Sequence, residues 1–259
     1  MRIGFLGAGN MASAILRGMR DMEKGCYDIS EAAVRRAEQE LGARGFSSGE
    51  ALCAWADIVV LAVKPQVLEG AVRPLAGALA GKAVASIAAG WSLERLAALL
   101  PESRLCRVMP NTPAMVGAGM AAIAKETTFA PAEFDCIREV FSAIGRVVVV
   151  EERLFDAVTA VSGSGPAYLY MVIEAMADAG VREGLSRAIA LELAAQTALG
   201  SAKMVLESGL HPAALRDMVC SPGGTTIDAV CTLEEKGLRA AVESAVRVCA
   251  EKSRAMSKQ

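Results

Sequence analysis

Two segments of this 259-residue chain combine glycines with the expected start of a helix, which suits them to hold an anionic ligand. The first, Gly7-Ala8-Gly9-Asn10-Met11-Ala12, follows the apolar run 2–6. It has the GxGxxA pattern of dinucleotide-binding loops. The first glycine allows a tight turn, the second lets a pyrophosphate approach the backbone, and the small third residue keeps the helix close to the strand. The phosphates would face the positive end of the helix, so the spacing predicts a bound dinucleotide.

The second segment, Ser221-Pro222-Gly223-Gly224-Thr225-Thr226, leads into an expected helix over 227–236. Consecutive backbone N–H groups at a helix start form an anion site, and a small carboxylate would fit there. Alternatively, one of the two threonines is a simple N-cap, which leaves the other hydroxyl available. The polar, glycine-rich segment Ser162-Gly163-Ser164-Gly165-Pro166-Ala167 is expected to be another substrate loop.

The elements that would position these segments differ between the two halves of the chain. Strands are expected at 2–6, 26–29, 57–63, 82–87, 104–108, 120–123 and 146–150, alternating with helices. Such alternation, with several runs apolar throughout, predicts an α/β fold with a Rossmann-like, doubly wound, mostly parallel sheet. After about residue 155 only helices are expected, at 168–179, 186–208, 212–220, 227–236 and from 238 to near the end. Gly180 is expected to end the first of these helices, Ser186 to cap the second and Gly209 to end it. His211 precedes Pro212 at a helix start and is interpreted as a cap or surface residue. We therefore expect a dinucleotide-binding domain at 1–153 and an all-α substrate and dimerisation domain at 154–259.

In a doubly wound sheet the ligand crevice lies at the carboxyl ends of the strands. The cofactor-binding residues expected from the glycine loop and these strand ends are Leu6, Gly7, Ala8, Gly9, Asn10, Met11, Ser30, Ala62, Val63, Lys64, Pro65, Ala88, Ala89 and Asn111. The choice between NADH and NADPH stays open. Asp28 is at the right spacing to bind a ribose 2′-hydroxyl, but it falls within the strand expected at 26–29. Arg35 and Arg36 could reach a 2′-phosphate from the following helix.

Composition excludes several classes of function. His211 is the single histidine, so a histidine-rich metal site or a mechanism with several imidazoles is impossible, and no metal is expected. A net charge of −2 without a basic block argues against a nucleic-acid partner. Each uncharged stretch is shorter than the roughly 20 apolar residues of a spanning helix, so no membrane segment is expected. Seven scattered cysteines without a CxxC pair are typical of a reducing cytoplasm. The alanine-rich helices favour close packing between two subunits.

Five segments, in order, closely resemble pyrroline-5-carboxylate reductases. They are 7–11, 62–65, 109–114, 161–168 and 218–227, the last followed by Leu233-Glu234. The resemblance covers essentially the whole chain and is weakest at 26–49. It implies reduction of 1-pyrroline-5-carboxylate to L-proline, the last step of proline biosynthesis, with NADPH or NADH. It also implies a homodimer through the C-terminal helices, often assembled into a larger ring such as a decamer.

For that reaction we expect the Thr226 hydroxyl to hydrogen-bond the ring nitrogen and position it. A cyclic imine can be protonated before hydride arrives, so a strong protein acid is not required. The substrate-binding residues expected are Ser162, Ser164, Gly165, Ser221, Gly223, Gly224, Thr225 and Thr226.

Two other functions are compatible with a glycine loop followed by a helical domain. A β-hydroxyacid dehydrogenase needs a lysine in the second domain to move the alcohol proton, and the candidate here, Lys203, falls in mid-helix away from both polar segments. A non-catalytic dinucleotide sensor would bind cofactor without turnover. The second anion site at 221–226 disfavours it.

Overall fold

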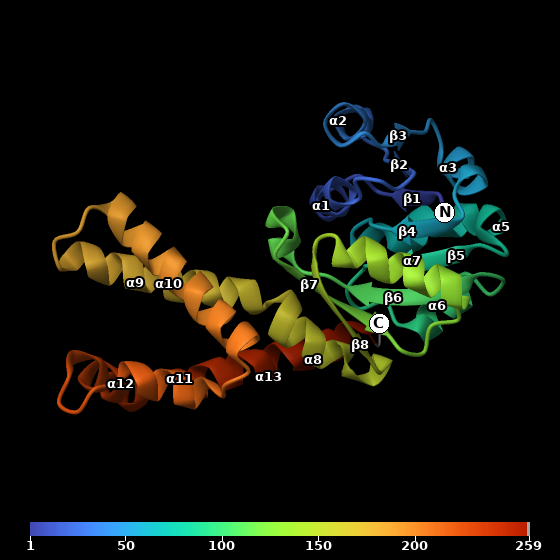
Figure 1. Cartoon of the computed structure of the whole chain (residues 1–259). Helices are drawn as coiled ribbons and strands as arrows, with labels where there is room; N and C mark the ends of the chain where they lie inside the picture. The colour runs from blue at the N-terminus through green and yellow to red at the C-terminus, as the bar shows by residue number, and fades with distance from the viewer. Residues whose placement is uncertain (258–259) are drawn as a thin grey trace. The chain divides into compact units, whose positions relative to one another are not determined.

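The structure, a computed structural model, describes residues 1–257, which form two compact units (Figure 1). One unit comprises Met1–Ser164 and the end of the last helix from Cys249 onward, and the other comprises Gly165–Val248. The boundary that we expect from sequence, after residue 153, stays a prediction.

A single eight-stranded sheet forms the frame of the first unit. Its strands are β1 (Ile3–Leu6), β2 (Lys24–Tyr27), β3 (Arg44–Gly45), β4 (Ile58–Leu61), β5 (Ala83–Ser86), β6 (Arg104–Met109), β7 (Gly119–Ala124) and β8 (Gly145–Val150). The strand order is β3-β2-β1-β4-β5-β6-β7-β8, and every neighbouring pair is parallel except β6 and β7. This is the doubly wound, mostly parallel sheet that the sequence predicts. The short strand β3 was not predicted, because its two residues make no apolar run.

Helices cover both faces of this sheet. They are α1 (Asn10–Gly18), α2 (Glu31–Leu41), α3 (Gly49–Trp55), α4 (Leu68–Val72), α5 (Ala76–Leu79), α6 (Leu93–Leu99), α7 (Pro131–Ser142) and α8 (Phe155–Val158), with short 3₁₀ turns at Pro65–Val67, Arg73–Leu75, Thr112–Val116 and Glu152–Leu154. One buried cluster packs Ile3 and Phe5 against α1 and α7. A second cluster, around Val59 and Leu61, covers the opposite face. Burial on both faces explains why these strands are apolar throughout.

The position of β2 corrects the sequence-based boundary at 26–29. Hydrogen bonding in register with β1 pairs Ile3 with Lys24 and Leu6 with Tyr27. The strand therefore ends at Tyr27, and Asp28 is the first residue after it rather than a residue inside it. Register with a partner strand, which is a tertiary property, fixes this boundary.

The second unit is helical, as predicted, with α9 (Gly165–Arg182), α10 (Arg187–Ser208), α11 (Pro212–Val219), α12 (Thr225–Glu235) and the first part of α13 (Leu238–Ser257). The Ser186 hydroxyl caps α10, and Gly209 ends it in the left-handed conformation at φ +68°. His211 caps α11, because its Nδ1 accepts a hydrogen bond from the Ala213 N–H at 3.2 Å. All three agree with the sequence-based expectation.

Two expectations in this region are wrong. The segment 162–167 is not a loop: a π-helical turn at Thr159–Gly163 leads almost directly into α9, which begins at Gly165. The helix also does not end at Gly180. A Cβ atom at Gly180 would lie 3.2 Å from the Cβ of Ala190 on α10, so this glycine permits close packing of α9 and α10 rather than ending α9.

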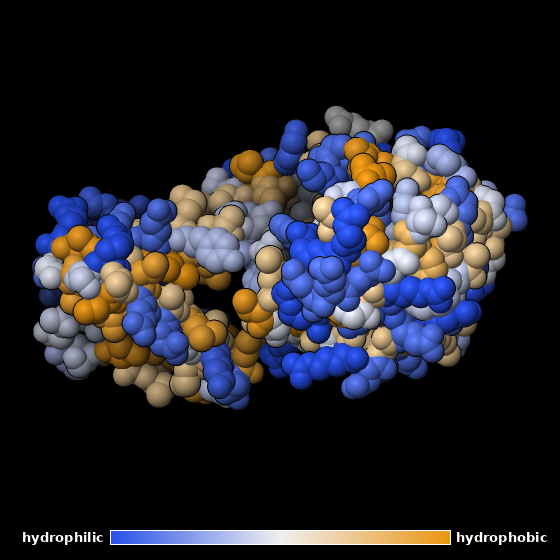
Figure 2. Space-filling model, turned by 90° about the horizontal axis from the view of Figure 1, so that it is seen from above, coloured by the Kyte–Doolittle hydropathy of each residue, from blue (hydrophilic) through white to orange (hydrophobic). Residues whose placement is uncertain are grey.

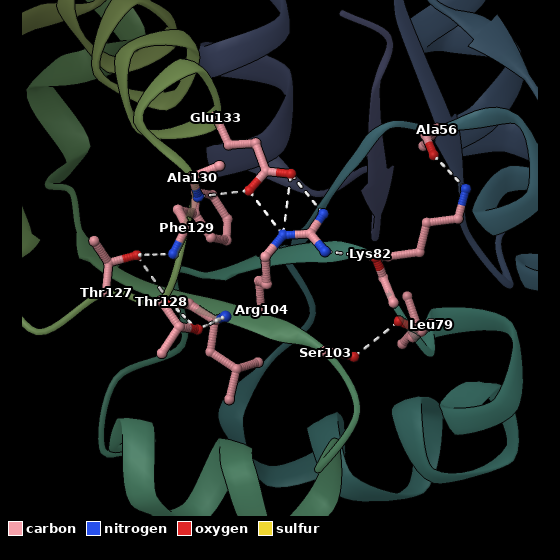
Figure 3. Close-up of polar contacts among 12 residues, drawn as sticks. Ala56, Leu79, Lys82, Ser103, Arg104, Thr127, Thr128, Phe129, Ala130 and Glu133 are labelled. Atoms are coloured by element: carbon pink, nitrogen blue, oxygen red, sulfur yellow. Dashed lines mark hydrogen bonds and ion pairs between the residues drawn. The ribbon is translucent and has the colours of Figure 1, made fainter.

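An ion pair joins β6 to α7 in the first unit (Figure 3). The Arg104 Nε donates to Glu133 Oε2 at 2.9 Å, and its Nη1 donates to the Gly81 carbonyl at 2.8 Å. Glu133 Oε2 also accepts the Ala130 N–H at 2.8 Å, which satisfies a donor at the start of α7. The Arg104 guanidinium lowers the pKa of the Glu133 carboxyl.

Replacement of this carboxylate should therefore lower stability in a pH-dependent way. Glu133→Gln is expected to reduce the free energy of unfolding by about 1–3 kcal/mol at pH 7. Because the folded-state pKa is depressed, the stabilisation is present above the ordinary glutamate value of about 4.3 and is lost as the pH falls through the folded-state value. Urea unfolding between pH 7 and pH 3 measures the difference. Glu139→Gln, at an exposed position of the same helix, is the control. A loss that is independent of pH would contradict this account.

Candidate active site

The glycine loop makes a tight turn between two neighbouring strands. The Gly7 N–H donates to the Tyr27 carbonyl at 2.8 Å, and Gly7 has φ +102°. A Cβ atom there would lie 2.8 Å from the backbone carbonyl carbon and oxygen of Ala62. Only glycine satisfies both the positive φ and the close contact with the residue that follows β4.

Gly9 has a different role from Gly7. Its φ is an ordinary −72°, and a Cβ atom would meet nothing within 4 Å. Gly9 is the N-cap residue of α1, and no side chain among residues 1–257 caps this helix start. Open space over an uncapped helix N-terminus fits the close approach of a pyrophosphate.

A cleft of about 670 Å³ opens beside this loop. Six of the predicted cofactor residues line it: Leu6, Gly7, Gly9, Ala62, Val63 and Lys64. Eight further lining residues are Tyr27, Asp28, Ile29, Gln66, Val67, Gly70, Ala71 and Leu75. Apart from Asp28, the sequence does not predict these residues, because they lie at the end of β2 or on the 3₁₀ turns and helix α4 after β4, without forming a motif. The cleft is large enough for a dinucleotide, and its apolar part suits an adenine ring.

Other predicted cofactor residues lie outside this cleft. Pro65 and Ala89 line a smaller cavity of about 220 Å³, next to Trp91, whose indole Nε1 donates to the Pro65 carbonyl at 3.0 Å. Ala88 is buried, and its N–H donates to the Ser86 hydroxyl at 3.3 Å. The backbone of Ala8 contributes to the loop, whereas Asn10 and Met11 begin α1. Their roles in binding cofactor stay predictions.

The Asn111 side chain, just after β6, forms hydrogen bonds to two other segments of the first unit. Its Nδ2 donates to the carbonyl of Ser162 at 3.1 Å and to the Ser162 hydroxyl at 3.3 Å. Its Oδ1 accepts the Met120 N–H at 2.8 Å. This side chain thus fixes Ser162, a predicted substrate residue, against the end of β6. Ser164 accepts a hydrogen bond from the Cys249 thiol at 3.2 Å.

Asp28 and Ser30 lie between β2 and α2. One Asp28 oxygen accepts the Ala8 N–H and the other accepts the Ser30 N–H, each at 2.8 Å. The carboxylate therefore ties the glycine loop to the end of β2. The Ser30 hydroxyl accepts the Ala33 N–H at 3.4 Å and caps α2.

In the helical unit, residues 221–224 form a turn that starts α12. The Gly224 N–H donates to the Ser221 carbonyl at 3.0 Å, and Gly223 has φ +65°, as the residue after a proline has in a type II turn. A Cβ atom at Gly224 would lie 2.3 Å from the Ser221 hydroxyl oxygen, so a larger residue there would require the Ser221 side chain to move. Gly224 is the N-cap residue, and neither Thr225 nor Thr226 caps the helix. The Thr226 hydroxyl makes no hydrogen bond to the described residues.

The three buried cysteines of the first unit, on β2, α3 and β6, are unsuited to catalysis. Cys26, Cys53 and Cys106 are buried, and burial raises the pKa of the first two to about 11 and of Cys106 to about 12. These thiols stay protonated at neutral pH and behave as small apolar groups.

A doubly wound sheet with a GxGxxA turn, an uncapped helix start and a cleft at the strand ends defines a dinucleotide-dependent oxidoreductase. The similarity of this chain to known protein families indicates the same class. Residues 152–256 match the family model for pyrroline-5-carboxylate reductase dimerisation, and residues 2–90 match the model for coenzyme F420-dependent NADP oxidoreductase. The chain is 44% identical to pyrroline-5-carboxylate reductase of Escherichia coli over 99% of this chain and 98% of the relative.

Solved structures show the same similarity over the full length. The pyrroline-5-carboxylate reductase of Coxiella burnetii superposes with a TM-score of 0.92 at 31% identity, covering 100% of this chain and 99% of the other. The Plasmodium falciparum enzyme, solved with NADP bound, gives a TM-score of 0.89 at 32% identity over 99% and 98% of the two chains. The chain belongs to the pyrroline-5-carboxylate reductase family and is an oxidoreductase.

The two glycines of the loop should respond differently to substitution. Gly7→Ala is expected to lower the free energy of unfolding by about 1–3 kcal/mol, because of its positive φ and the contact with Ala62. Gly9→Ala should leave stability nearly unchanged but weaken dinucleotide binding about tenfold, because its methyl group occupies the phosphate approach. Thermal unfolding and titration with reduced cofactor separate the two effects. Unchanged binding by the Gly9 variant would exclude this site for the pyrophosphate.

Proposed function

We propose that this chain reduces 1-pyrroline-5-carboxylate to L-proline, with hydride from NADH or NADPH, in the cytoplasm. The observation that carries the proposal is the turn at 221–224. This turn leads into a helix start without a side-chain cap, which suits a small carboxylate. The chain also matches a known pyrroline-5-carboxylate reductase over nearly the full length of both proteins. The cleft beside the glycine loop supplies the second requirement, a place for the dinucleotide.

The substrate carboxylate is proposed to bind at the start of α12. The first residues of a helix have N–H groups without intrahelical acceptors, and the helix dipole places positive potential there. The Ser221 hydroxyl lies at the same turn, against Gly224. Gly223 and Thr225 complete this backbone cradle. Ser162, Ser164 and Gly165 are proposed as further substrate contacts, with Ser162 held in place by Asn111.

Thr226 is proposed to act on the ring nitrogen. When bound, the reduced nicotinamide supplies the hydride that the imine carbon receives. The Thr226 side chain is half-buried, and its hydroxyl is not engaged by the described residues, so it can hydrogen-bond a ligand. Such a bond orients the imine and relays a proton to the nitrogen from water, which makes a strong acid unnecessary.

Loss of this hydroxyl should reduce catalysis. Thr226→Ala is expected to lower kcat/KM for 1-pyrroline-5-carboxylate by at least about tenfold, since a hydrogen bond to a reacting group is removed. Cofactor oxidation at saturating cofactor is the measurement, and Thr226→Ser should recover most of the activity. Thr232→Ala is the matched control, because this hydroxyl of the same helix donates only to the Asp228 carbonyl. Kinetics unchanged in Thr226→Ala would remove this residue from the mechanism.

The two alternative functions receive less support. Lys203, which a β-hydroxyacid dehydrogenase would need, is exposed on α10 and pairs with Glu207 at 3.7 Å. A dinucleotide sensor would have no use for the anion-binding turn. Turnover of the cyclic imine distinguishes the reductase from both.

We also propose that the helical unit forms a homodimer, which is the basis of any larger ring such as a decamer. The surface of this unit carries exposed apolar side chains on α9 and α10 (Figure 2). α10 is long and apolar enough to cross a membrane by length and composition alone. The match to a dimerisation family over 152–256 favours a second copy of the chain as the cover for these side chains. Apolar side chains exposed together on neighbouring helices are typical of a protein–protein interface.

A charge on this surface should therefore disrupt the dimer. Leu199 is 59% exposed on α10, and Leu199→Glu is expected to shift the chain toward monomers at micromolar concentration. Light scattering coupled to size-exclusion chromatography measures the mass. Gln39→Glu, an exposed position on α2, adds the same charge elsewhere and should leave the mass unchanged. An unaltered chain that runs as a monomer, or a variant that stays dimeric, would contradict the proposed interface.

A further inference from the structure

Asp28 lies at the position where doubly wound folds bind the ribose of a dinucleotide. In a doubly wound sheet, an acidic residue at the carboxyl end of the second strand hydrogen-bonds the 2′-hydroxyl of NAD, whereas an arginine nearby accommodates the 2′-phosphate of NADP. β2 ends at Tyr27, so Asp28 is the first residue beyond it, and it lines the cleft.

The Asp28 carboxylate is fixed in position by the protein. Its two oxygens accept the Ala8 and Ser30 N–H groups, each at 2.8 Å. A carboxylate has about four acceptor sites, so each oxygen can accept a further hydrogen bond from a ribose hydroxyl. The same oxygens would repel a phosphate group, because a carboxylate and a phosphate carry charges of the same sign.

The charges around Asp28 strengthen this repulsion. Glu31 follows three residues later, in the first turn of α2, and is exposed. The Arg35 guanidinium, which could attract a phosphate, donates to Glu31 Oε2 at 2.9 Å in an exposed ion pair one helical turn apart. Arg36 lies about 7 Å further along the helix axis than Glu31.

Lys64, the basic residue that lines the cleft, lies on the opposite side of the glycine loop from Asp28. Lys64 follows β4, and β1 separates β4 from β2 in the strand order. Lys64 therefore follows a strand two positions away from β2 in the sheet. At the ribose end, Ile29 is 93% exposed and lines the cleft, which suits contact with an adenine ring.

We propose that Asp28, assisted by Glu31, sets the cofactor preference of this chain, and that it binds NADH in preference to NADPH. Asp28 accepts hydrogen bonds from the adenosine ribose and excludes a 2′-phosphate by charge. The inference deepens the proposed reductase function by naming the cofactor that it uses.

The experiment measures the dissociation constants of NADH and NADPH for the purified chain by nicotinamide fluorescence, without the imine. The unaltered chain should bind NADH at least about tenfold more tightly, since juxtaposed like charges are costly. Asp28→Asn should reduce the ratio of the NADPH dissociation constant to the NADH dissociation constant, mainly because NADPH binds more tightly. Glu31→Gln should shrink it less. Glu40→Gln, which removes the same charge from the last turn of α2, should leave it unchanged.

A second measurement does not depend on any variant. 5′-AMP should displace NADH from the unaltered chain more effectively than adenosine 2′,5′-bisphosphate, since the two differ only by the 2′-phosphate. Equal or tighter binding of NADPH, or better displacement by the bisphosphate, would overturn the proposal, as would an unchanged ratio in Asp28→Asn. Because these are binding measurements, a chain that prefers NADH but does not reduce the imine would contradict the reductase proposal alone.

Discussion

The cofactor-binding unit depends on the close contact between the glycine loop and the two strands on either side of it. Gly7 donates its N–H to the end of β2 on one side and lies against the backbone of Ala62, beyond β4, on the other. The Asp28 carboxylate adds a third link by accepting the Ala8 N–H. This arrangement aims the start of α1 into the cleft. A side chain at residue 7 would separate the strands or displace the helix, so the absence of a Cβ atom there determines the geometry of the site.

Glycines also permit close packing in the helical unit, where they bring helices and turns together rather than shape a cofactor loop. Gly180 lets α9 approach Ala190 on α10, and Gly224 lets the turn at Ser221 close against the start of α12. The turn at Ser221 is also closed by the Gly224 N–H, which donates to the Ser221 carbonyl at 3.0 Å. Packing of backbone against small side chains leaves the larger apolar residues of α10 on the outside, where we propose that a second chain covers them.

The charged residues of the sheet unit separate into structural and ligand-facing groups. Arg104 and Glu133 join a strand to a helix, and Arg107 and Glu152 form a further pair that is largely buried. Asp28 differs from these carboxylates because it faces backbone N–H groups and the cleft rather than a cation. A carboxylate without a cationic partner, beside a cleft, is available to discriminate between ligands by charge.

The sequence by itself determined the alternating pattern that gives a doubly wound sheet, the glycine loop at 7–12, the helical second half and the caps at Ser186 and His211. These features follow from local properties: apolar periodicity, backbone freedom at glycine and hydrogen bonding by short polar side chains. Only the tertiary structure decided where β2 ends, because its boundary depends on pairing with β1, and this moved Asp28 to the edge of the cleft. It likewise decided that Gly180 packs two helices together rather than ending one, and that Asn111 binds Ser162. Contacts between residues far apart in the chain leave no periodic signal in the sequence, and such contacts settle which polar groups are occupied and which remain available to a ligand.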